Sequence, residues 1–172
     1  HELKNNIIDT FNTGYTDEYG LKELDDQAEE RLADLEIMQE KKLVNKLLEE
    51  IRKPNGGLSA YGEDEVRRAL RIGAVETLLV SEGLDKNKYT IECSNCDYNQ
   101  EIFDNKEPEF DSCPECQSSL NIVEEKDIVD DFYEEAEKVG SDVELISDES
   151  EEGELLLNAF GGIAAILRFL IS

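Results

Sequence analysis

Four cysteines carry the clearest chemical signal in this sequence. They form two Cys-x-x-Cys pairs, Cys93 with Cys96 and Cys113 with Cys116, and no other cysteine occurs. Each pair folds into a tight turn that offers two thiolates, and four thiolates complete the tetrahedral shell that Zn²⁺ prefers. Because four protein ligands leave no open coordination position, the pattern predicts a structural zinc site and not a catalytic one.

Other uses of the same four thiols remain open at this point. Two disulfides, two redox-active pairs or four unrelated core cysteines would use the same residues. The chain opens with no export signal, so an oxidising compartment is not indicated. The use of every cysteine in two matched pairs also argues against chance. Iron is an alternative to zinc, since both metals accept four thiolates in tetrahedral geometry.

The sequence lacks the residue arrangements needed for nucleophilic catalysis and for binding nucleotide phosphates. The single histidine is His1, at the start of a chain that does not begin with Met, and we expect it to carry no functional weight, so no Ser-His-Asp or Cys-His arrangement is expected. No Gly-x-x-x-x-Gly-Lys phosphate loop occurs. Acidic residues number 43 against 17 basic ones, so a pair of carboxylates is expected simply to be solvated surface. We therefore predict that the chain is not an enzyme.

A net charge of −26 over 172 residues limits the kinds of partner. Autonomous nucleic-acid binding needs clustered Lys and Arg, and the one basic group, Arg67, Arg68 and Arg71, is expected to be a solvated stripe on a helix. An anionic membrane is disfavoured for the same reason, and the longest apolar run, residues 163–171, is too short to span a bilayer. A basic protein partner or a salt-rich cytoplasm fits this charge better.

Helices and strands alternate along the chain and must position the cysteines. Periodic apolar residues predict helices, and short apolar or alternating runs bounded by turn signals predict strands. The expected helices cover residues 21–35, 43–51, 63–72 and 128–139, with Asp127 as a cap and a helical turn or two at 155–158. The expected strands cover residues 6–13, 76–81, 88–93, 120–123, 143–146 and 163–171, and residues 147–153 are expected to be an acidic loop.

This alternation predicts a three-layer α/β domain, because the last strands are apolar enough to be covered on both faces. Residues 1–172 are expected to form this domain, with residues 88–124 as a small zinc-stapled insert between two strands. The middle of that insert is mostly polar and has little core of its own. Zinc binding, worth about 10–16 kcal/mol in small zinc peptides, would then hold it folded.

Two Gly-Gly pairs and one arginine are further candidates. Gly56 follows a Pro-Asn turn and is expected to lie in a loop. Gly161 and Gly162 are expected to form a tight turn that needs positive φ or close backbone approach, and this turn is also a candidate partner surface. Arg168, a lone base in an apolar strand, needs either a carboxylate partner or an exposed end.

Five segments also follow one another in a recognisable order. They read Asn-Ile-Ile-Asp-Thr at residues 6–10, Gly-Tyr-Thr-Asp-Glu-Tyr-Gly-Leu at 14–21, Met-Gln-Glu-Lys-Lys-Leu at 38–43, Gly-Ala-Val-Glu-Thr-Leu-Leu-Val at 73–80 and Phe-Gly-Gly-Ile-Ala-Ala-Ile-Leu-Arg-Phe at 160–169. Together they resemble the C-terminal domain of archaeal and eukaryotic class-1 peptide chain release factors. The resemblance implies a fold like the ribosomal L7Ae proteins, with a mixed central sheet between helices and a mini-domain that carries zinc in archaea.

The resemblance implies a role in translation termination without catalysis. The family's Gly-Gly-Gln loop is absent, since Gly57 is followed by Leu58 and Gly162 by Ile163, and its Asn-Ile-Lys-Ser motif is absent too. The chain starts at His1 and not at Met, so we expect a fragment of a longer cytoplasmic protein. On its own it should neither hydrolyse peptidyl-tRNA nor read stop codons.

The partners implied by the resemblance are an elongation factor 1A-type GTPase, the ribosome and the recycling ABC-type ATPase. Gly161, Gly162 and Arg168 are the expected contact residues. Two other interpretations share the fold: the equivalent domain of a Pelota-like ribosome-rescue factor, and an L7Ae-type RNA-binding module, which would need a basic face. A metal-dependent or thiol enzyme would need an open coordination position or redox-active cysteines.

Overall fold

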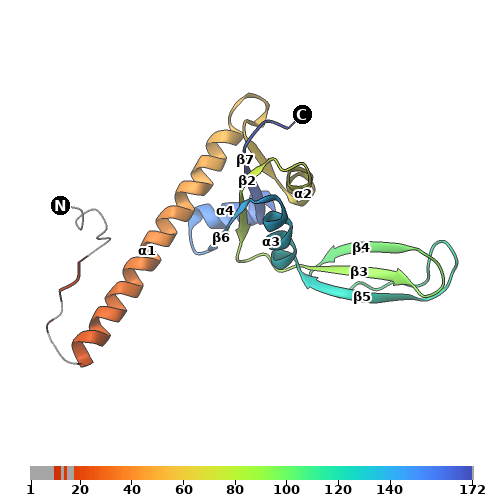
Figure 1. The fold of residues 1–172 in the computed structure, drawn as a ribbon, viewed down its shortest axis with the longest axis horizontal. Coiled ribbons are helices and arrows are strands. Elements are labelled where there is room, and N and C mark those ends of the chain that lie inside the picture. The colour runs from red at the N-terminus through yellow and green to blue at the C-terminus, as the bar shows by residue number, and fades with distance from the viewer. Residues whose placement is uncertain (1–9, 13, 15–17, 172) are drawn as a thin grey trace. The chain divides into compact units, whose positions relative to one another are not determined.

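The computed structural model describes residues 10–12, 14 and 18–171 (Figure 1). The chain divides into two compact units, His1–Gln39 and Glu40–Ser172, which are described separately below. The strand predicted for residues 6–13 lies outside the described part of the chain, apart from residues 10–12, which form no strand.

Helix α1 (Glu18–Ile51) is one continuous helix of 34 residues where two were predicted. The prediction of a break was wrong because residues 36–42 contain neither Gly nor Pro and consist largely of good helix formers. The helix ends where the Pro-Asn-Gly-Gly signal predicts, and a short 3₁₀ turn, Pro54–Gly56, follows it. Neither α1 nor any other helix in the described residues combines the length and apolar character needed to cross a membrane.

The central sheet has four strands in the order β1-β7-β2-β6. Its strands are β1 (Ser59–Tyr61), β2 (Val75–Ser81), β6 (Asp142–Ile146) and β7 (Ile163–Leu167). The pair β2/β6 is parallel, whereas β2/β7 and β1/β7 are antiparallel, so the sheet is mixed. The last strand ends four residues before the predicted end, because its neighbours β1 and β2 begin opposite Ile166 and Leu167 and leave nothing beyond to pair with.

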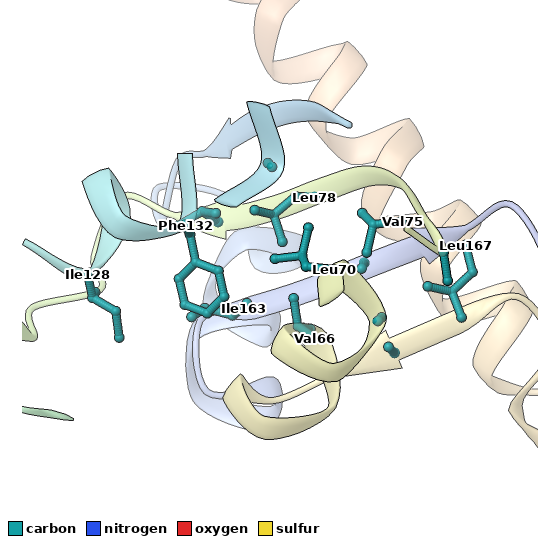
Figure 2. Packing of buried hydrophobic residues seen from close by; sticks show 14 of the residues in the cluster. Val66, Leu70, Val75, Leu78, Ile128, Phe132, Ile163 and Leu167 are labelled. Atoms are coloured by element: carbon teal, nitrogen blue, oxygen red, sulfur yellow. The ribbon is translucent and has the colours of Figure 1, made fainter. Parts of the chain in front are cut away.

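Helices cover both faces of the central sheet. Leu78 of β2 packs in a cluster with residues of α2 (Glu63–Arg71) and α3 (Ile128–Val139), as Figure 2 shows. Its neighbour Leu79 packs instead with Leu47 of α1 and Leu156 of α4 (Glu151–Phe160). Since successive strand residues point to opposite faces, the two clusters lie on opposite sides of the sheet, and the predicted three-layer α/β fold is confirmed.

The start of α3 was predicted correctly, whereas the start of α4 was not. Asp127 caps α3 as predicted, its carboxylate accepting a hydrogen bond of 2.7 Å from the backbone of Val129. In contrast, α4 begins at Glu151, inside the predicted acidic loop, and runs for ten residues where only a turn or two was expected. The reason is Ser150, which caps the helix through the backbone N–H of Gly153 at 3.1 Å. The acidic residues that suggested a loop form the first turn, where the helix dipole favours them.

A second, antiparallel sheet with the order β4-β3-β5 lies between β2 and α3 in the sequence. Its strands are β3 (Asn87–Cys93), β4 (Asn99–Asp104) and β5 (Leu120–Asp127). Strand β4 was not predicted, because its six residues are mostly polar. The buried side chains of this sheet, Tyr89 and Ile91, come from its central strand. The sheet has one end at residues 87, 104 and 127, next to α3, and the other at Cys93 and Leu120, next to the cysteines.

Candidate metal centre

The four cysteines meet at the end of the second sheet that lies away from α3. Their sulfur atoms all lie within 4.8 Å of one another. The nearest pairs are Cys93 with Cys116 at 3.4 Å and Cys96 with Cys113 at 3.6 Å. A tetrahedral zinc ion with Zn–S bonds of about 2.3 Å separates its sulfurs by about 3.8 Å. The four thiols are free and unbridged, so this donor set fits one tetrahedral metal ion.

Two backbone loops of the same design present the sulfurs. The backbone N–H of Cys93 donates to the carbonyl of Tyr98 at 3.0 Å, and that of Cys113 donates to the carbonyl of Ser118 at 2.9 Å. Each bond closes a loop over the same five-residue step. Gln117, in the second loop, has a left-handed φ of 63° and donates to the carbonyl of Cys113 at 2.9 Å. The repeated geometry presents the two cysteine pairs on equivalent turns.

Hydrogen bonds join the two loops to each other. Ser94 donates from its backbone to the carbonyl of Ser119 at 3.0 Å, and the two hydroxyls lie 2.9 Å apart. The backbone N–H of Asn95 also points at the sulfur of Cys93 at 3.4 Å. The backbone therefore holds the ligand atoms in place through contacts of its own.

The thiols differ in how readily they lose a proton. Hydrogen bonds from the Ser118 side chain and backbone lower the pKa of Cys116 to about 6. The backbone of Tyr98 acts in the same direction on Cys96, but burial and the neighbouring thiols outweigh it and raise the pKa of Cys96 to about 12. Four thiolates can share this space only with a cation among them.

The turn before β7 contains two glycines because its backbone adopts positive φ angles at both positions. Gly161 and Gly162 have φ angles of 71° and 79°, which L side chains rarely adopt. A Cβ on Gly162 would lie 3.2 Å from Leu84 and 3.4 Å from Leu157. The predicted tight turn is therefore confirmed, whereas a contact of these glycines with a partner stays a prediction.

Arg168 lies just beyond the end of β7 and is exposed. Its backbone N–H donates to the carbonyl of Ala74 at 2.8 Å, and its guanidinium donates to the carbonyl of Gly140. Of the two predicted alternatives, the exposed end is the one observed. Arg168 and Gly162 lie six residue steps apart along β7, about 20 Å, so these candidate residues do not form a single cluster.

Apolar side chains are exposed beside Arg168. Phe169 is 48% and Leu170 is 66% exposed. Ile72, two residues before the Ala74 carbonyl that holds the Arg168 backbone, is 52% exposed. We call Ile72, Arg168, Phe169 and Leu170 the strand-end patch.

The expectation for Arg67 was wrong. Arg68 and Arg71 are exposed as predicted, but Arg67 is only 6% exposed. The signal that could have found it is its position, since it lies beside Val66 and three residues before Leu70, on the apolar face of α2.

The fold defines a class of protein, since it is shared with release factors and with Pelota. The structure is similar to the C-terminal domain of a peptide chain release factor from Methanosarcina mazei, with a TM-score of 0.81 and 43% identity over 91% of this chain and 98% of that one. It is also similar to a chain of the structure described as a model of ribosome-bound archaeal Pelota and ABCE1, with a TM-score of 0.57 and 26% identity over 94% of this chain and 35% of that one.

The sequence narrows this class to one family. Residues 37–171 match the family model of eRF1 domain 3. The peptide chain release factor subunit 1 of Methanocaldococcus jannaschii is 48% identical over 99% of this chain and 42% of that protein. This chain therefore belongs to the eRF1 domain 3 family, which confirms the resemblance. It spans about two fifths of the length of the curated relatives it matches.

Proposed function

We propose that this chain acts in translation termination as the non-catalytic, partner-docking domain of a peptide chain release factor. The observation that carries the proposal is the 43% identity to a release-factor domain that the chain matches almost end to end, against 26% to Pelota. A Pelota-like rescue factor is the second candidate, because it shares the fold. A peptidyl-tRNA release assay tests the non-catalytic role: the chain alone should give no release above background, and turnover would contradict it.

The strand-end patch is the proposed site for an elongation factor 1A-type GTPase. Its apolar side chains are exposed, so a partner that covered them would remove apolar surface from water. Arg168 adds a positive charge to a chain that carries a strong net negative charge. Aromatic and arginine side chains are the residues that most often dominate binding energy at protein interfaces. The −26 charge would speed the approach of a partner with basic patches. In this proposal Gly161 and Gly162 set the start of β7 and contribute through its position.

Calorimetric titration of the chain with an archaeal elongation factor 1A-type GTPase tests this site. We expect saturable binding with GTP bound, weaker binding at higher salt, and a loss of about tenfold or more for Phe169→Ala. Val123→Ala is the matched control, since Val123 is similarly exposed, at 53%, but lies on β5. Equal binding by Phe169→Ala and the wild type would refute the patch, and no binding at all would refute autonomous docking.

The four cysteines are the proposed ligands of one structural zinc ion, and residues 88–124 the insert that it holds together. The bound ion would supply the positive charge that four clustered thiolates need. Cys96→Ser should lose the metal and disorder residues 93–116 while the central sheet stays folded, as seen by metal analysis and amide NMR spectra. Ser112→Ala, on an exposed neighbour of Cys113, should keep the metal. Global unfolding of Cys96→Ser would show that the insert is not a separable module.

The ribosome and an ABC-type ATPase are the further proposed partners, and the cytoplasm the proposed compartment. The Pelota relative is described as ribosome-bound together with ABCE1. An L7Ae-type RNA-binding role is disfavoured, because burial removes Arg67 from the group of Arg67, Arg68 and Arg71.

A further inference from the structure

Arg67 is the centre of a buried ionic cluster between α2 and α3. Its guanidinium donates to Asp131 at 2.8 Å and to Glu135 at 2.6 Å, both on α3, and to Glu63 on its own helix at 3.3 Å. Arg67 and Asp131 are each only 6% exposed. A buried arginine with carboxylate partners is costly to separate from them, because either group would be left as an unpaired charge.

Two aromatic rings enclose the same guanidinium. Its central carbon lies 4.2 Å from the ring centre of Phe132 and 4.6 Å from that of Phe103. Phe132 belongs to α3 and the main core (Figure 2), whereas Phe103 comes from β4 of the second sheet. The Nη2 nitrogen of Arg67 is buried without a hydrogen-bond partner among the described residues, so stacking contributes to holding the group. Arg67 therefore contacts both α3, which packs on the central sheet, and β4 of the second sheet.

Asp131 receives cations from the second sheet. Lys88 of β3 lies 3.3 Å from its carboxylate, and Lys126 of β5 lies 3.9 Å from it. Lys88 also pairs with Glu101 of β4 at 2.9 Å. All three strands of the second sheet thus reach the Arg67–Asp131 pair or its immediate partners.

The cluster lies at one end of the second sheet and the cysteines at the other. Lys88 and Cys93 are five residues apart on β3, a distance of about 17 Å along a strand. The chain itself links this sheet to the rest only through the segment after β2 and the junction of β5 with α3. Two tethers at the same end would leave a hinge, and a small rotation there would displace the cysteines by a larger distance.

We propose that Arg67, Asp131 and Lys88 form an ionic joint that sets the orientation of the second sheet, and so the position of its cysteine end, relative to the central sheet. The joint lets only one arrangement keep the buried charges paired and the guanidinium between its two rings. Burial alone would lower the pKa values of Arg67 and Lys88, but Glu135 and Asp131 for the first, and Glu101 and Asp131 for the second, raise both above their usual values. Both cations therefore remain charged at neutral pH.

Residual dipolar couplings of backbone amides in the full, zinc-supplemented chain test the joint. In the wild type, one alignment tensor should fit the amides of both sheets. Arg67→Met keeps an apolar stem but removes the guanidinium, and the second sheet should then lose the common tensor and show weaker alignment than the central sheet. Arg71→Met is the control, since Arg71 is exposed on the same helix and should leave the common tensor unchanged.

Two further readouts separate orientation from folding. Amide shifts within each sheet and the metal content should stay as in the wild type when only the joint is lost. If Arg67→Met does not fold, Lys88→Met removes a contact from the side of the second sheet and leaves the pairs of Arg67 with α3 intact. A common tensor in a folded Arg67→Met chain, or two tensors in the wild type, would overturn the proposal.

Discussion

At the scale of residues, a few individual carboxylates have specific structural roles. Most acidic residues in the described part of the chain are exposed, but a few accept hydrogen bonds that fix other elements. Asp131 accepts from Arg67 and Lys88, which come from two different elements. Glu50 accepts from the Lys53 side chain and, at 3.0 Å, from the backbone of Leu58. Replacing either of these two carboxylates should therefore change stability more than replacing the exposed acidic residue next to it in the sequence.

Replacing Asp131 by Ala should lower the free energy of unfolding by about 3 kcal/mol, because it leaves the buried Arg67 and the half-buried Lys88 with fewer counter-charges. The value lies at the low end for a broken buried pair, since Arg67 keeps Glu135. Denaturant titration measures the change. The exposed neighbour Asp130 is the control, and Asp130→Ala should cost below about 1 kcal/mol. Equal costs for both variants would contradict the structure.

Glu50 should contribute to stability only in its charged form. The hydrogen bond from Lys53, followed by that from Leu58, lowers the pKa of Glu50 below its usual value of 4.5. A lowered folded pKa means that the contribution is present above pH 4.5 and is lost as the pH falls through the folded value. The difference in Tm between the wild type and Glu50→Gln should therefore shrink between neutral pH and about pH 3. For Glu49→Gln, on an exposed residue, we expect a smaller difference at neutral pH.

At the scale of elements, α4 shows how closely a helix can approach the turn before it. The carbonyl oxygen of Ser147 would lie 1.8 Å from a Cβ placed on Gly153. Gly153 also supplies the N–H that caps the helix through Ser150. Glycine inside a helix usually weakens it, and here the close approach of backbone explains its presence.

Gly153→Ala should therefore destabilise the protein, although the same change in an ordinary helix stabilises it by about 1 kcal/mol. The overlap with backbone requires a shift of the turn or of α4, and overpacking of this kind typically costs about 1–3 kcal/mol. Thermal unfolding monitored by circular dichroism measures the effect. Asn158→Ala, at an exposed position of the same helix, should be neutral or stabilising. A raised Tm for Gly153→Ala would show that the turn can move freely.

At the scale of the whole molecule, the core lies in one of the two units. Every buried hydrophobic residue in the described part of the chain lies between Val44 and Leu167. The family match covers residues 37–171 and the second compact unit is Glu40–Ser172. The core, the central sheet and the candidate metal centre thus belong to one unit.

A chain consisting of residues 37–172 should consequently fold on its own. Its free energy of unfolding should stay within about 1 kcal/mol of that of the full chain, because no buried apolar side chain in the described residues is removed. Urea titration and an amide NMR spectrum check both stability and fold. An unfolded or molten product would mean that the first 36 residues contribute to the core's stability.

Local patterns were sufficient for much of the fold. The capped helix α3, the amphipathic helix α2 and the apolar strand β2 were predicted with nearly correct ends, because capping, periodicity and β-branched runs act over a few residues. The spacing of the cysteines likewise singled out the four thiols that the structure brings within 4.8 Å of one another. The errors in α1 and α4 were also local in origin, since neither a missing breaker nor the cap at Ser150 was given enough weight.

The sequence by itself therefore determined the fold class, most elements and the four clustered thiols. Only the tertiary structure decided the rest. Strand β1 has three residues and exists because β7 pairs with it, and β7 ends where its neighbours end. Arg67 is buried because residues far along the chain, Phe103 and Asp131, close over it. The position of Arg67 on the apolar face of α2 indicates burial, but its partners on α3 and β4 are distant in sequence, as are the strands that pair in a sheet, and no pattern of neighbouring residues encodes such partners.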